Sequence, residues 1–281
     1  MVRVHVFVLA VCAELLTFTA AAHAQADMPS AELELDEMLN LEVKDLADKT
    51  DVDAADTADL EGLKGATVDW HKAFLESGLF IVLMNVKRAA IEPGTQAGMK
   101  GPFLGDYWRS IKGSLKWKWK DGDHFFINYV QHPAEGSTFA FIMRQNDPNS
   151  IDPTSCGFSK RYFKQTFKTV IFSAIGSTLF EIGPISEASI GNVGYFKQSG
   201  LVDFFVTPTV GVAFMIGQDL LDNYVIKNLE RKIHNRIFLA TVRVVLNPTR
   251  SLANTLAFKQ PWYRQRGRRG FGLSGCSFTS R

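Results

Sequence analysis

Long apolar stretches that are interrupted only by single charged residues constrain this chain more than any other feature of its sequence. Ten uncharged residues follow Glu76, twelve follow Lys168 and fifteen follow Asp203. A helix that crosses a bilayer needs about 20 consecutive, mostly apolar residues, so none of these stretches is a clear membrane span. We therefore expect either the buried helices of a bundle or helices that lie against a bilayer, and the sequence leaves both arrangements open.

The spacing of apolar residues predicts a mainly α fold. The 281-residue chain is 46% hydrophobic, which is enough to bury a core. We expect a compact, membrane-associated bundle of about six to seven helices. Residues 235–246 are ambiguous, because their valine-rich end would also suit a strand. The other helices are predicted within residues 70–90, 105–119, 133–144, 159–181, 208–231 and 249–258.

Charge is distributed unevenly along the chain and divides it into regions. Residues 26–62 hold thirteen acidic and two basic residues, whereas residues 63–281 hold fifteen acidic and twenty-eight basic residues. Low hydrophobicity combined with high charge opposes a stable core. We therefore predict a disordered acidic arm at 25–66, a helical body at 67–263 and a basic tail at 264–281.

The first 24 residues have the features of a secretory signal peptide. Arg3 precedes an apolar stretch, and the small residues of Ala22-His23-Ala24 form a cleavage pattern. Glu14 departs from this pattern because it places a charge inside the apolar stretch, which leaves an uncleaved amphipathic start as the alternative. We expect cleavage after Ala24 and export to the periplasm.

Cysteine and histidine usage argues against a metal site. After removal of the signal peptide, Cys156 and Cys276 are the only cysteines, and the six histidines are widely scattered. These residues do not have zinc-finger spacing, so no metal is expected. The two cysteines can form one disulfide or remain free thiols. The chain also lacks a GxxxxGK[ST] phosphate loop and a GxSxG elbow, so no cofactor is expected.

Residues 128–148 place polar residues at both ends of an apolar helix. His132 precedes Pro133, which suits the first helical position, so His132 is the predicted cap. Glu135 falls in the first turn and Arg144 in the last, where the helix dipole favours an acid and a cation respectively. Capping and dipole rules explain this segment without any function; the alternative is that its ends belong to a polar site.

Two further segments carry acidic residues in apolar surroundings. Ser173, Ser177 and Glu181 recur every four residues and form one polar stripe on a helix. Asp203 precedes an apolar stretch, in which Thr207 is predicted to cap a helix that starts at the following proline. A buried carboxylate is costly unless it is paired, so these residues either hold helices in register or converge on one polar cluster. The predicted members of that cluster are His132, Arg144, Ser177, Glu181, Glu187, Asp203 and Thr207.

Three motifs in this part of the chain resemble the signature of a known family. They are HPxxG (His132–Gly136), ExGPxSE (Glu181–Glu187) and DxxxTPxxG (Asp203–Gly211). Together they resemble an uncharacterised bacterial envelope protein family, a domain of unknown function, over roughly residues 120–262. The resemblance implies an exported, membrane-associated helical protein and no particular chemistry. The Arg- and Gly-rich end of the chain departs from the family pattern.

A stretch of alternating lysine and tryptophan lies ahead of these motifs. Trp117 and Trp119 alternate with Lys116, Lys118 and Lys120, and this combination is favoured at a membrane–water boundary. The basic tail would suit the same anionic lipid surface. A solvated helix face is the alternative, and nucleic acid is not an expected partner, because an exported protein rarely meets it.

Two functions are compatible with these features. The leading hypothesis is a non-enzymatic scaffold or binding module that docks on a membrane or on another envelope protein. The alternative is an enzyme that modifies lipid or another envelope substrate, with His132 as acid or base and Glu181 and Asp203 as supporting carboxylates. Convergence of these side chains around an open pocket would favour the enzyme, whereas burial with every group paired would favour the scaffold.

Overall fold

The computed structural model is helical throughout the part of the chain that it describes. Within that part there is no β-strand, which confirms the predicted mainly α fold. The predicted signal peptide, the acidic arm, Cys156, Cys276 and the basic tail after Arg264 lie outside the described residues. The described residues are 67–114, 119, 125–150, 158, 160–191 and 201–264.

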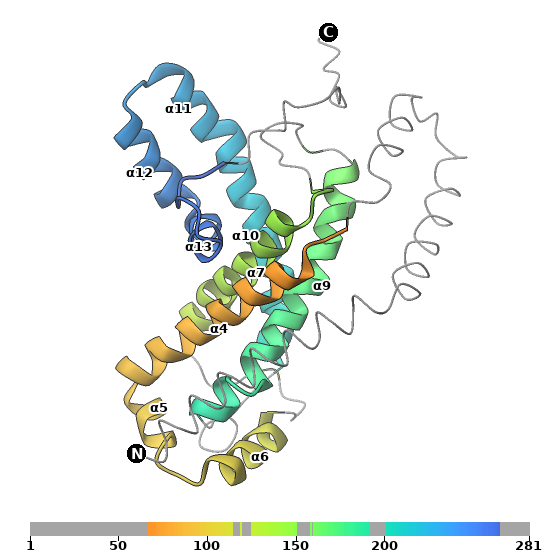
Figure 1. Cartoon of the computed structure of the whole chain (residues 1–281), viewed down its shortest axis with the longest axis vertical. Coiled ribbons are helices and arrows are strands. Elements are labelled where there is room, and N and C mark those ends of the chain that lie inside the picture. The colour runs from red at the N-terminus through yellow and green to blue at the C-terminus, as the bar shows by residue number, and fades with distance from the viewer. Residues whose placement is uncertain are drawn as a thin grey trace, which may run out of the picture.

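Nine α-helices and three π-helical turns follow one another along the described residues (Figure 1). Seven of these α-helices are nine or more residues long, in agreement with the number predicted. The long helices are α4 (Trp70–Ile91), α6 (Phe103–Ser114), α7 (His132–Asn146), α9 (Lys160–Ile182), α10 (Val202–Leu220), α12 (Arg236–Leu246) and α13 (Pro248–Leu256). The shorter elements are α5 (Pro93–Gly98), α11 (Lys227–Lys232), η1 (Ile127–Gln131), η2 (Glu187–Gly191) and η3 (Leu221–Ile226).

Four of the long helices form the body of the molecule. α7 packs against α4, α9 and α10 (Figure 1). His132 faces Asp203 at the start of α10, and Arg144 faces Asp219 near its end, so α7 and α10 run in the same direction. α9 runs the opposite way, because Tyr162 in its first turn reaches Asp219. α4 also runs opposite to α7, since its early turns receive a hydrogen bond from the last turn of α7.

The apolar core lies where α4, α7 and α9 meet. Phe80 of α4 meets Phe139 of α7 edge to face, with ring centroids 5.2 Å apart. Phe74 of α4 lies 5.8 Å from Phe172 of α9, again between ring centroids. Burying a side chain of this size stabilises a fold by about 1.5–3 kcal/mol. The middle of the bundle is therefore apolar, and the charged residues of α7 and α10 lie towards its two ends.

α7 and α10 approach each other closely at two glycines. A Cβ added to Gly211 would lie 2.8 Å from the Cα of Gly136, and one added to Gly136 would overlap the carbonyl oxygen of Thr207. The two backbones can approach this closely because neither glycine carries a side chain. This crossing fixes the relative position of the two helices, and with it the polar side chains that they carry on either side.

The HPxxG motif does not begin a helix, contrary to the sequence prediction. Phe126 and Gln131 already have helical backbone angles, so His132 is not a cap and Pro133 lies inside a continuous helix. The π-helical turn η1 widens the helix just before the proline, whose ring would crowd the preceding turn of a regular α-helix. The local rule fails because a wider turn accommodates the proline.

Two other helices also differ from the sequence analysis. α10 begins at Val202 and contains Pro208 in its interior, so Thr207 is not a cap. Packing of α10 against α7 outweighs the one backbone hydrogen bond that Pro208 cannot donate. The ambiguous range 235–246 is helical, because the side chain of Asn235 accepts hydrogen bonds from two backbone N–H groups of the first turn of α12.

Two helical segments, Tyr162–Gly191 and Val202–Lys232, are long and apolar enough to cross a membrane. The sequence analysis judged these stretches too short because it counted residues from one charge to the next. In the structure, the acids that interrupt them are buried, as Glu181 and Asp219 show, so they do not interrupt the outer faces of the helices. Length and composition alone do not distinguish such a segment from the core helix of a soluble protein.

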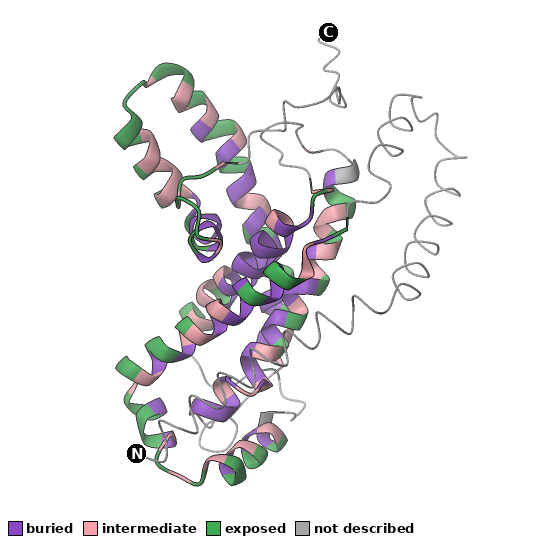
Figure 2. Ribbon diagram, in the orientation of Figure 1, coloured by how far each residue is buried: buried purple, intermediate pink, exposed green. Residues whose placement is uncertain are grey.

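The hairpin of α11 and α12 contrasts with the body of the molecule. None of the residues of these two helices is buried, and Figure 2 shows this hairpin in the colours of exposed and partly exposed residues. Figure 2 also shows that the buried residues concentrate along α7 and on the sides of α9 and α10 that face it.

Candidate functional site

Six charged or titratable side chains gather at one end of the bundle, and we call this group the acid-rich cluster. They come from α4, from the first turn of α7, from the end of α9, from the π-helical turn η2 and from the start of α10. The members are Arg88, His132, Glu135, Glu181, Glu187 and Asp203.

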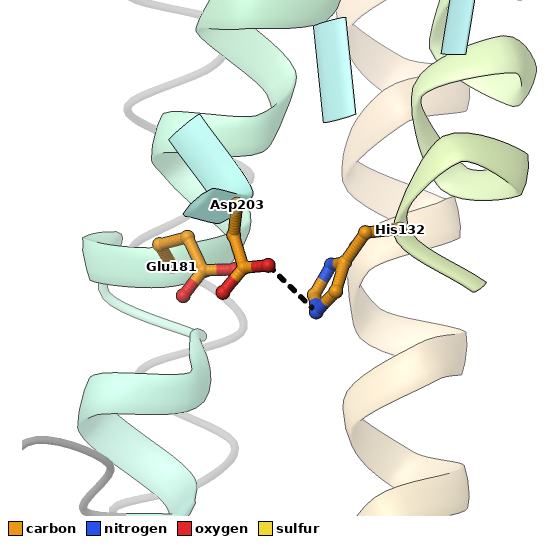
Figure 3. A group of neighbouring side chains, drawn as sticks. All are labelled: His132, Glu181 and Asp203. Atoms are coloured by element: carbon orange, nitrogen blue, oxygen red, sulfur yellow. Dashed lines mark ion pairs between the residues drawn. The ribbon is translucent and has the colours of Figure 1, made fainter. Parts of the chain in front are cut away.

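His132 lies between two carboxylates of this cluster. Its Nε2 is 3.4 Å from Oδ1 of Asp203 (Figure 3), and its Nδ1 is 3.3 Å from Oε2 of Glu135. Glu181 lies beside Asp203, and one nitrogen or oxygen atom from each of His132, Glu181 and Asp203 lies within 4.8 Å of the other two. The fold therefore brings together the three residues on which the sequence analysis placed the polar site.

These side chains are buried, and several of their atoms lack a regular hydrogen bond. His132, Glu181 and Asp203 are 2%, 7% and 6% exposed. Oε1 of Glu181, Nδ1 of His132 and Oε2 of Glu135 are buried without a hydrogen bond of regular geometry. Buried polar groups in folded proteins are nearly always hydrogen-bonded, so the exceptions here mark the acid-rich cluster as unusual.

Arg88 is the permanent cation of the acid-rich cluster. It forms an ion pair with Glu187, and its Nε lies 3.1 Å from Oε2 of Glu92. Burial by itself lowers the pKa of the Arg88 guanidinium, but the carboxylates of Glu187, Glu92 and Glu181 raise that pKa above its ordinary value. Arg88 therefore stays charged. The four carboxylates of the cluster nevertheless outnumber this one guanidinium and the imidazole.

Neighbouring residues hold the acid-rich cluster in place. Ser177 donates a 3.3 Å hydrogen bond to the backbone carbonyl of Asp203 and so ties α9 to the start of α10. Gln131 donates a 3.2 Å hydrogen bond to Oε1 of Glu135. Thr207 lies one turn after Asp203, with its hydroxyl buried and without a hydrogen-bond partner. The predicted cluster members Ser177 and Thr207 are thus neighbours of the charged group.

A second buried group lies at the opposite ends of α7 and α10, and Asp219 is at its centre. Arg144 donates two hydrogen bonds to the Asp219 carboxylate, with N···O distances of 2.5 and 2.7 Å. The hydroxyl of Tyr162 donates a third, at 2.6 Å, and Arg250 also pairs with Asp219. Bidentate arginine–carboxylate pairs of this kind are among the strongest hydrogen-bonded contacts in proteins.

Asp222 extends this second group towards the end of the described chain. Nη1 of Arg250 is 2.6 Å from Oδ2 of Asp222, and Nε of Arg264 is 2.7 Å from the same oxygen. Burial lowers the pKa of Arg264, although Asp222 opposes the change. We call this group the arginine cluster; its members are Arg144, Tyr162, Asp219, Asp222, Arg250 and Arg264.

The structure corrects the predicted place of Arg144. The sequence analysis assigned it to one cluster with His132, Glu181 and Asp203, but Arg144 belongs to the arginine cluster. Twelve helical residues separate it from His132, and at 1.5 Å per residue this is roughly 18 Å along α7. A single site cannot include both ends of this helix.

Several charged members of the two clusters were not anticipated from the sequence. Arg88 and Asp222 carry no motif. Asp203 and Asp219 lie at the two ends of the same uncharged stretch. The argument that selected Asp203 as a buried polar residue could therefore have selected Asp219 as well. Arg250 lies within residues 120–262, over which the family resemblance extends, but outside its three motifs. Their side chains meet only because the tertiary structure brings together helices that are distant in sequence.

The predicted membrane surface is described at only one residue. Trp119 is 52% exposed, and its ring lies 6.3 Å from that of Phe205, near the start of α10. The other predicted members, Lys116, Trp117, Lys118 and Lys120, lie outside the described residues.

Comparison of the chain with family models, with curated proteins and with solved structures finds no match. Function must therefore be argued from the geometry. An imidazole surrounded by carboxylates can bind a cation or hold a proton. His132, Glu181 and Asp203 converge, as the enzyme hypothesis requires, but each is at most 7% exposed, so they do not surround an open pocket.

Proposed function

We propose that this chain is a membrane-embedded helical protein of the cell envelope, in which buried polar clusters between the helices form a non-enzymatic binding module. The observation that carries this proposal is the distribution of polarity in the bundle. α9 and α10 bury carboxylate and hydroxyl side chains against α7 and expose large apolar side chains on their outer faces, although Lys164, Thr178 and Thr209 are also exposed.

The outer face of α9 is a stripe of large apolar residues. Phe163, Phe167, Ile171 and Ile175 recur every four residues and are between 45% and 61% exposed. On the opposite side of the same helix, Ser173 and the other polar residues of the stripe are buried. A soluble protein exposes contiguous apolar patches of this size mainly where a partner or a membrane covers them.

The outer face of α10 and η3 carries no charged residue. Between Val202 and Ile226 the charged residues are all aspartates, and each of them is buried. Phe205 and Tyr224, both exposed, mark the two ends of this face. They are 19 residues apart, which is roughly 28 Å of helix and close to the 30 Å or so of a bilayer's hydrocarbon core.

Aromatic residues near the two ends of the bundle also fit a bundle that is embedded in a bilayer. Trp119 lies beside Phe205 at one end. At that end, α6 is tied to α9 by a hydrogen bond from Tyr107 to the carbonyl of Ile182, and α6 carries the exposed Trp108. Tyr224 is exposed at the other end. Tryptophan and tyrosine are enriched at the two interfaces of a membrane.

Embedding differs from peripheral attachment to the inner or outer membrane, which the lysine–tryptophan stretch and the basic tail predict from the sequence. Peripheral binding through lysines and arginines weakens with salt, whereas helices whose outer faces contact lipid stay in the membrane. The buried ionisable residues agree with embedding, since such residues in membrane proteins face the interior of the bundle and mark functional sites. Export, the periplasmic side and an envelope partner remain parts of this proposal that rest on the signal-like start and on the family resemblance.

Membrane extraction tests this proposal. The full chain with a C-terminal tag would be expressed in a bacterium, and isolated membranes would be washed separately with high salt and with alkaline carbonate. We expect the protein to remain in the pellet after both washes and to need detergent for release. Release by salt would overturn embedding in favour of surface attachment, and release by carbonate alone would overturn it in favour of a protein partner.

A pair of matched variants identifies the face that contacts lipid. Ile171→Arg combined with Ile175→Arg places two charges on the outer face of α9 and should make the protein extractable by carbonate or lower its amount in membranes. Ile237→Arg combined with Val245→Arg changes two apolar residues of α12 that are more exposed, at 80% and 66%, and should not. Equal behaviour of the two pairs would show that α9 does not contact lipid.

Export is tested separately by mass spectrometry of the purified protein. A mature N-terminus at Gln25 is expected if the signal-like segment is removed after Ala24. An intact Met1 in protein recovered from the envelope would contradict cleavage without bearing on whether the helices are embedded.

A further inference from the structure

We infer that the acid-rich cluster is a binding site for one divalent transition-metal ion, which is held by Nε2 of His132 and by carboxylate oxygens of Glu181 and Asp203. The sequence analysis placed these three residues in one polar cluster but expected no metal, because the ligands come from three helices and have no motif spacing. The inference rests on the distances between the ligand atoms, on the orientation of the imidazole and on the excess of buried negative charge.

The separations of the ligand atoms suit a metal ion. Two ligands bound at about 2.1 Å to a tetrahedral ion lie about 3.4 Å apart. The distance from Nε2 of His132 to Oδ1 of Asp203 is 3.4 Å. The atom of Glu181 lies within 4.8 Å of the other two, so a movement of its side chain by at most roughly 1.5 Å would complete the set.

Glu135 orients the imidazole for this role. Its Oε2 lies 3.3 Å from Nδ1 of His132, while its Oε1 accepts a hydrogen bond from Gln131. A neutral histidine whose Nδ1 proton points at a carboxylate presents a lone pair at Nε2. Metal-binding histidines are commonly held by such a carboxylate. The Nε2 lone pair then faces an oxygen of Asp203, and a cation between these two acceptors, either a proton or a metal ion, would be bound by both.

A metal ion would engage more of the buried polar atoms of the cluster than one additional proton would. A proton at Nε2 would let His132 bridge Glu135 and Asp203, but Oε1 of Glu181 would remain buried without a donor. A divalent ion engages Glu181 as well. It also supplies two positive charges to a group in which four carboxylates outnumber the guanidinium of Arg88 and the imidazole of His132, and buried charges need such compensation.

The ligand set indicates which metals the site prefers. One imidazole nitrogen with two carboxylate oxygens suits Zn²⁺, Mn²⁺ or Fe²⁺, whereas Ca²⁺ requires six to eight oxygen ligands. Three protein ligands leave a further coordination position for water. Because the ligands come from α7, α9 and α10, the ion would fasten these helices together at one end of the bundle.

The test is metal binding by the purified full chain in detergent micelles, so its result does not depend on whether the protein is embedded in a membrane. The protein would be treated with EDTA, exchanged into metal-free buffer and titrated with ZnCl₂ and, separately, MnCl₂. We expect one bound ion per chain by elemental analysis. We also expect a rise in melting temperature of roughly 5–10 °C at a metal concentration about 100 times the dissociation constant.

Three variants decide whether the bound ion occupies this cluster. Asp203→Asn and His132→Gln each remove one ligand from a different helix and should abolish both the stoichiometric binding and the thermal shift. Glu76→Gln is the matched control, because Glu76 is a buried carboxylate that receives hydrogen bonds from Gln145 and Asn146, outside the cluster. Circular dichroism of each metal-free variant establishes that it is folded.

Two results would overturn the inference. Absence of binding by the wild-type protein would leave protons as the counter-charge of the cluster. Binding that persists in folded Asp203→Asn and His132→Gln would place the ion elsewhere on the chain. If one of these variants does not fold, Glu181→Gln replaces it as the second test, and retention of the ion in that variant would equally overturn the inference.

Discussion

The two buried polar clusters differ in how completely their charges are satisfied. In the arginine cluster, Asp219 receives hydrogen bonds from two arginines and a tyrosine, and both of its oxygens are engaged. In the acid-rich cluster, carboxylates are in excess and Oε1 of Glu181 has no hydrogen-bond donor. One cluster is a closed network that fastens helices together, whereas the other holds a surplus of negative charge.

The comparison shows that burial of charge serves different purposes at the two ends of the same helix. Both clusters lie on α7 and α10, on opposite sides of the crossing at Gly136 and Gly211. In the closed network, each carboxylate is paired with two guanidinium groups. The acid-rich cluster has unsatisfied atoms and an unbalanced charge, which is why the inferred metal site lies there.

The largest effect should follow from breaking the arginine cluster. Asp219→Ala leaves the guanidinium groups of Arg144 and Arg250 buried without their shared carboxylate, and we expect a loss of about 3–5 kcal/mol in the free energy of unfolding. Thermal unfolding in detergent measures it. Lys72→Ala, which removes an exposed ion pair with Asp69 but leaves Asp69 to cap α4, is the control and should change stability little. A loss no larger than that of the control would show that the network is not a structural fastening.

The next largest effect should come from the crossing between the two clusters. Gly136→Ala forces a methyl group against the backbone of Thr207, and overpacking of this kind costs about 1–3 kcal/mol or more. Gly217→Ala is the matched control, since a Cβ there has no neighbour within 4 Å; it should be neutral or stabilise α10 by about 0.4–1 kcal/mol. Equal melting temperatures for the two variants would contradict the close approach.

A substitution in the acid-rich cluster is not expected to lower the free energy of unfolding of the metal-free protein. In metal-free protein, Glu181→Gln removes one of several mutually repelling carboxylates while it keeps the shape of the side chain. The free energy of unfolding should stay the same or rise by about 1 kcal/mol. The same measurement on Asp219→Asn should show a loss. If Glu181→Gln also destabilises the metal-free protein strongly, the carboxylate is already paired and the contrast between the clusters fails.

The smallest effect expected is the coupling between the clusters. Glu181→Ala and Arg144→Ala act on sites separated by several turns of α7, so their stability losses should add within about 0.3–0.5 kcal/mol. Arg144→Ala and Asp219→Ala, which break one contact, should lose much less together than the sum of the two. A large coupling between Glu181 and Arg144 would mean that the two clusters act as one network.

Part of the site could be predicted from the sequence, because a carboxylate in an apolar helix needs a polar partner wherever it lies. This argument selected Glu181 and Asp203, and their convergence with His132 agrees with it. It could not select the partners. Arg144 was assigned to the wrong cluster, and Arg88 was not considered, because an isolated helix does not show which neighbour each of its faces meets.

The errors at the helix starts have a similar cause. Pro133 and Pro208 indicated new helices by local rules, but both lie inside continuous ones. The rule that proline indicates the start of a helix considers only the one backbone hydrogen bond that proline cannot donate. Packing along the whole length of a helix can outweigh the loss of that bond, and this packing depends on residues that are far away in the sequence.

The sequence by itself determined that this protein is helical and that its apolar helices carry isolated polar residues, since hydrophobic spacing depends only on the order of residues along the chain. The tertiary structure decided which of those residues meet and which faces remain outside. The approach of α7 to α10 at Gly136 and Gly211 places His132 against Asp203 and Arg144 against Asp219. The net charge, exposure and binding capacity of a cluster depend on all the helices that contribute to it, so they are fixed only when those helices pack.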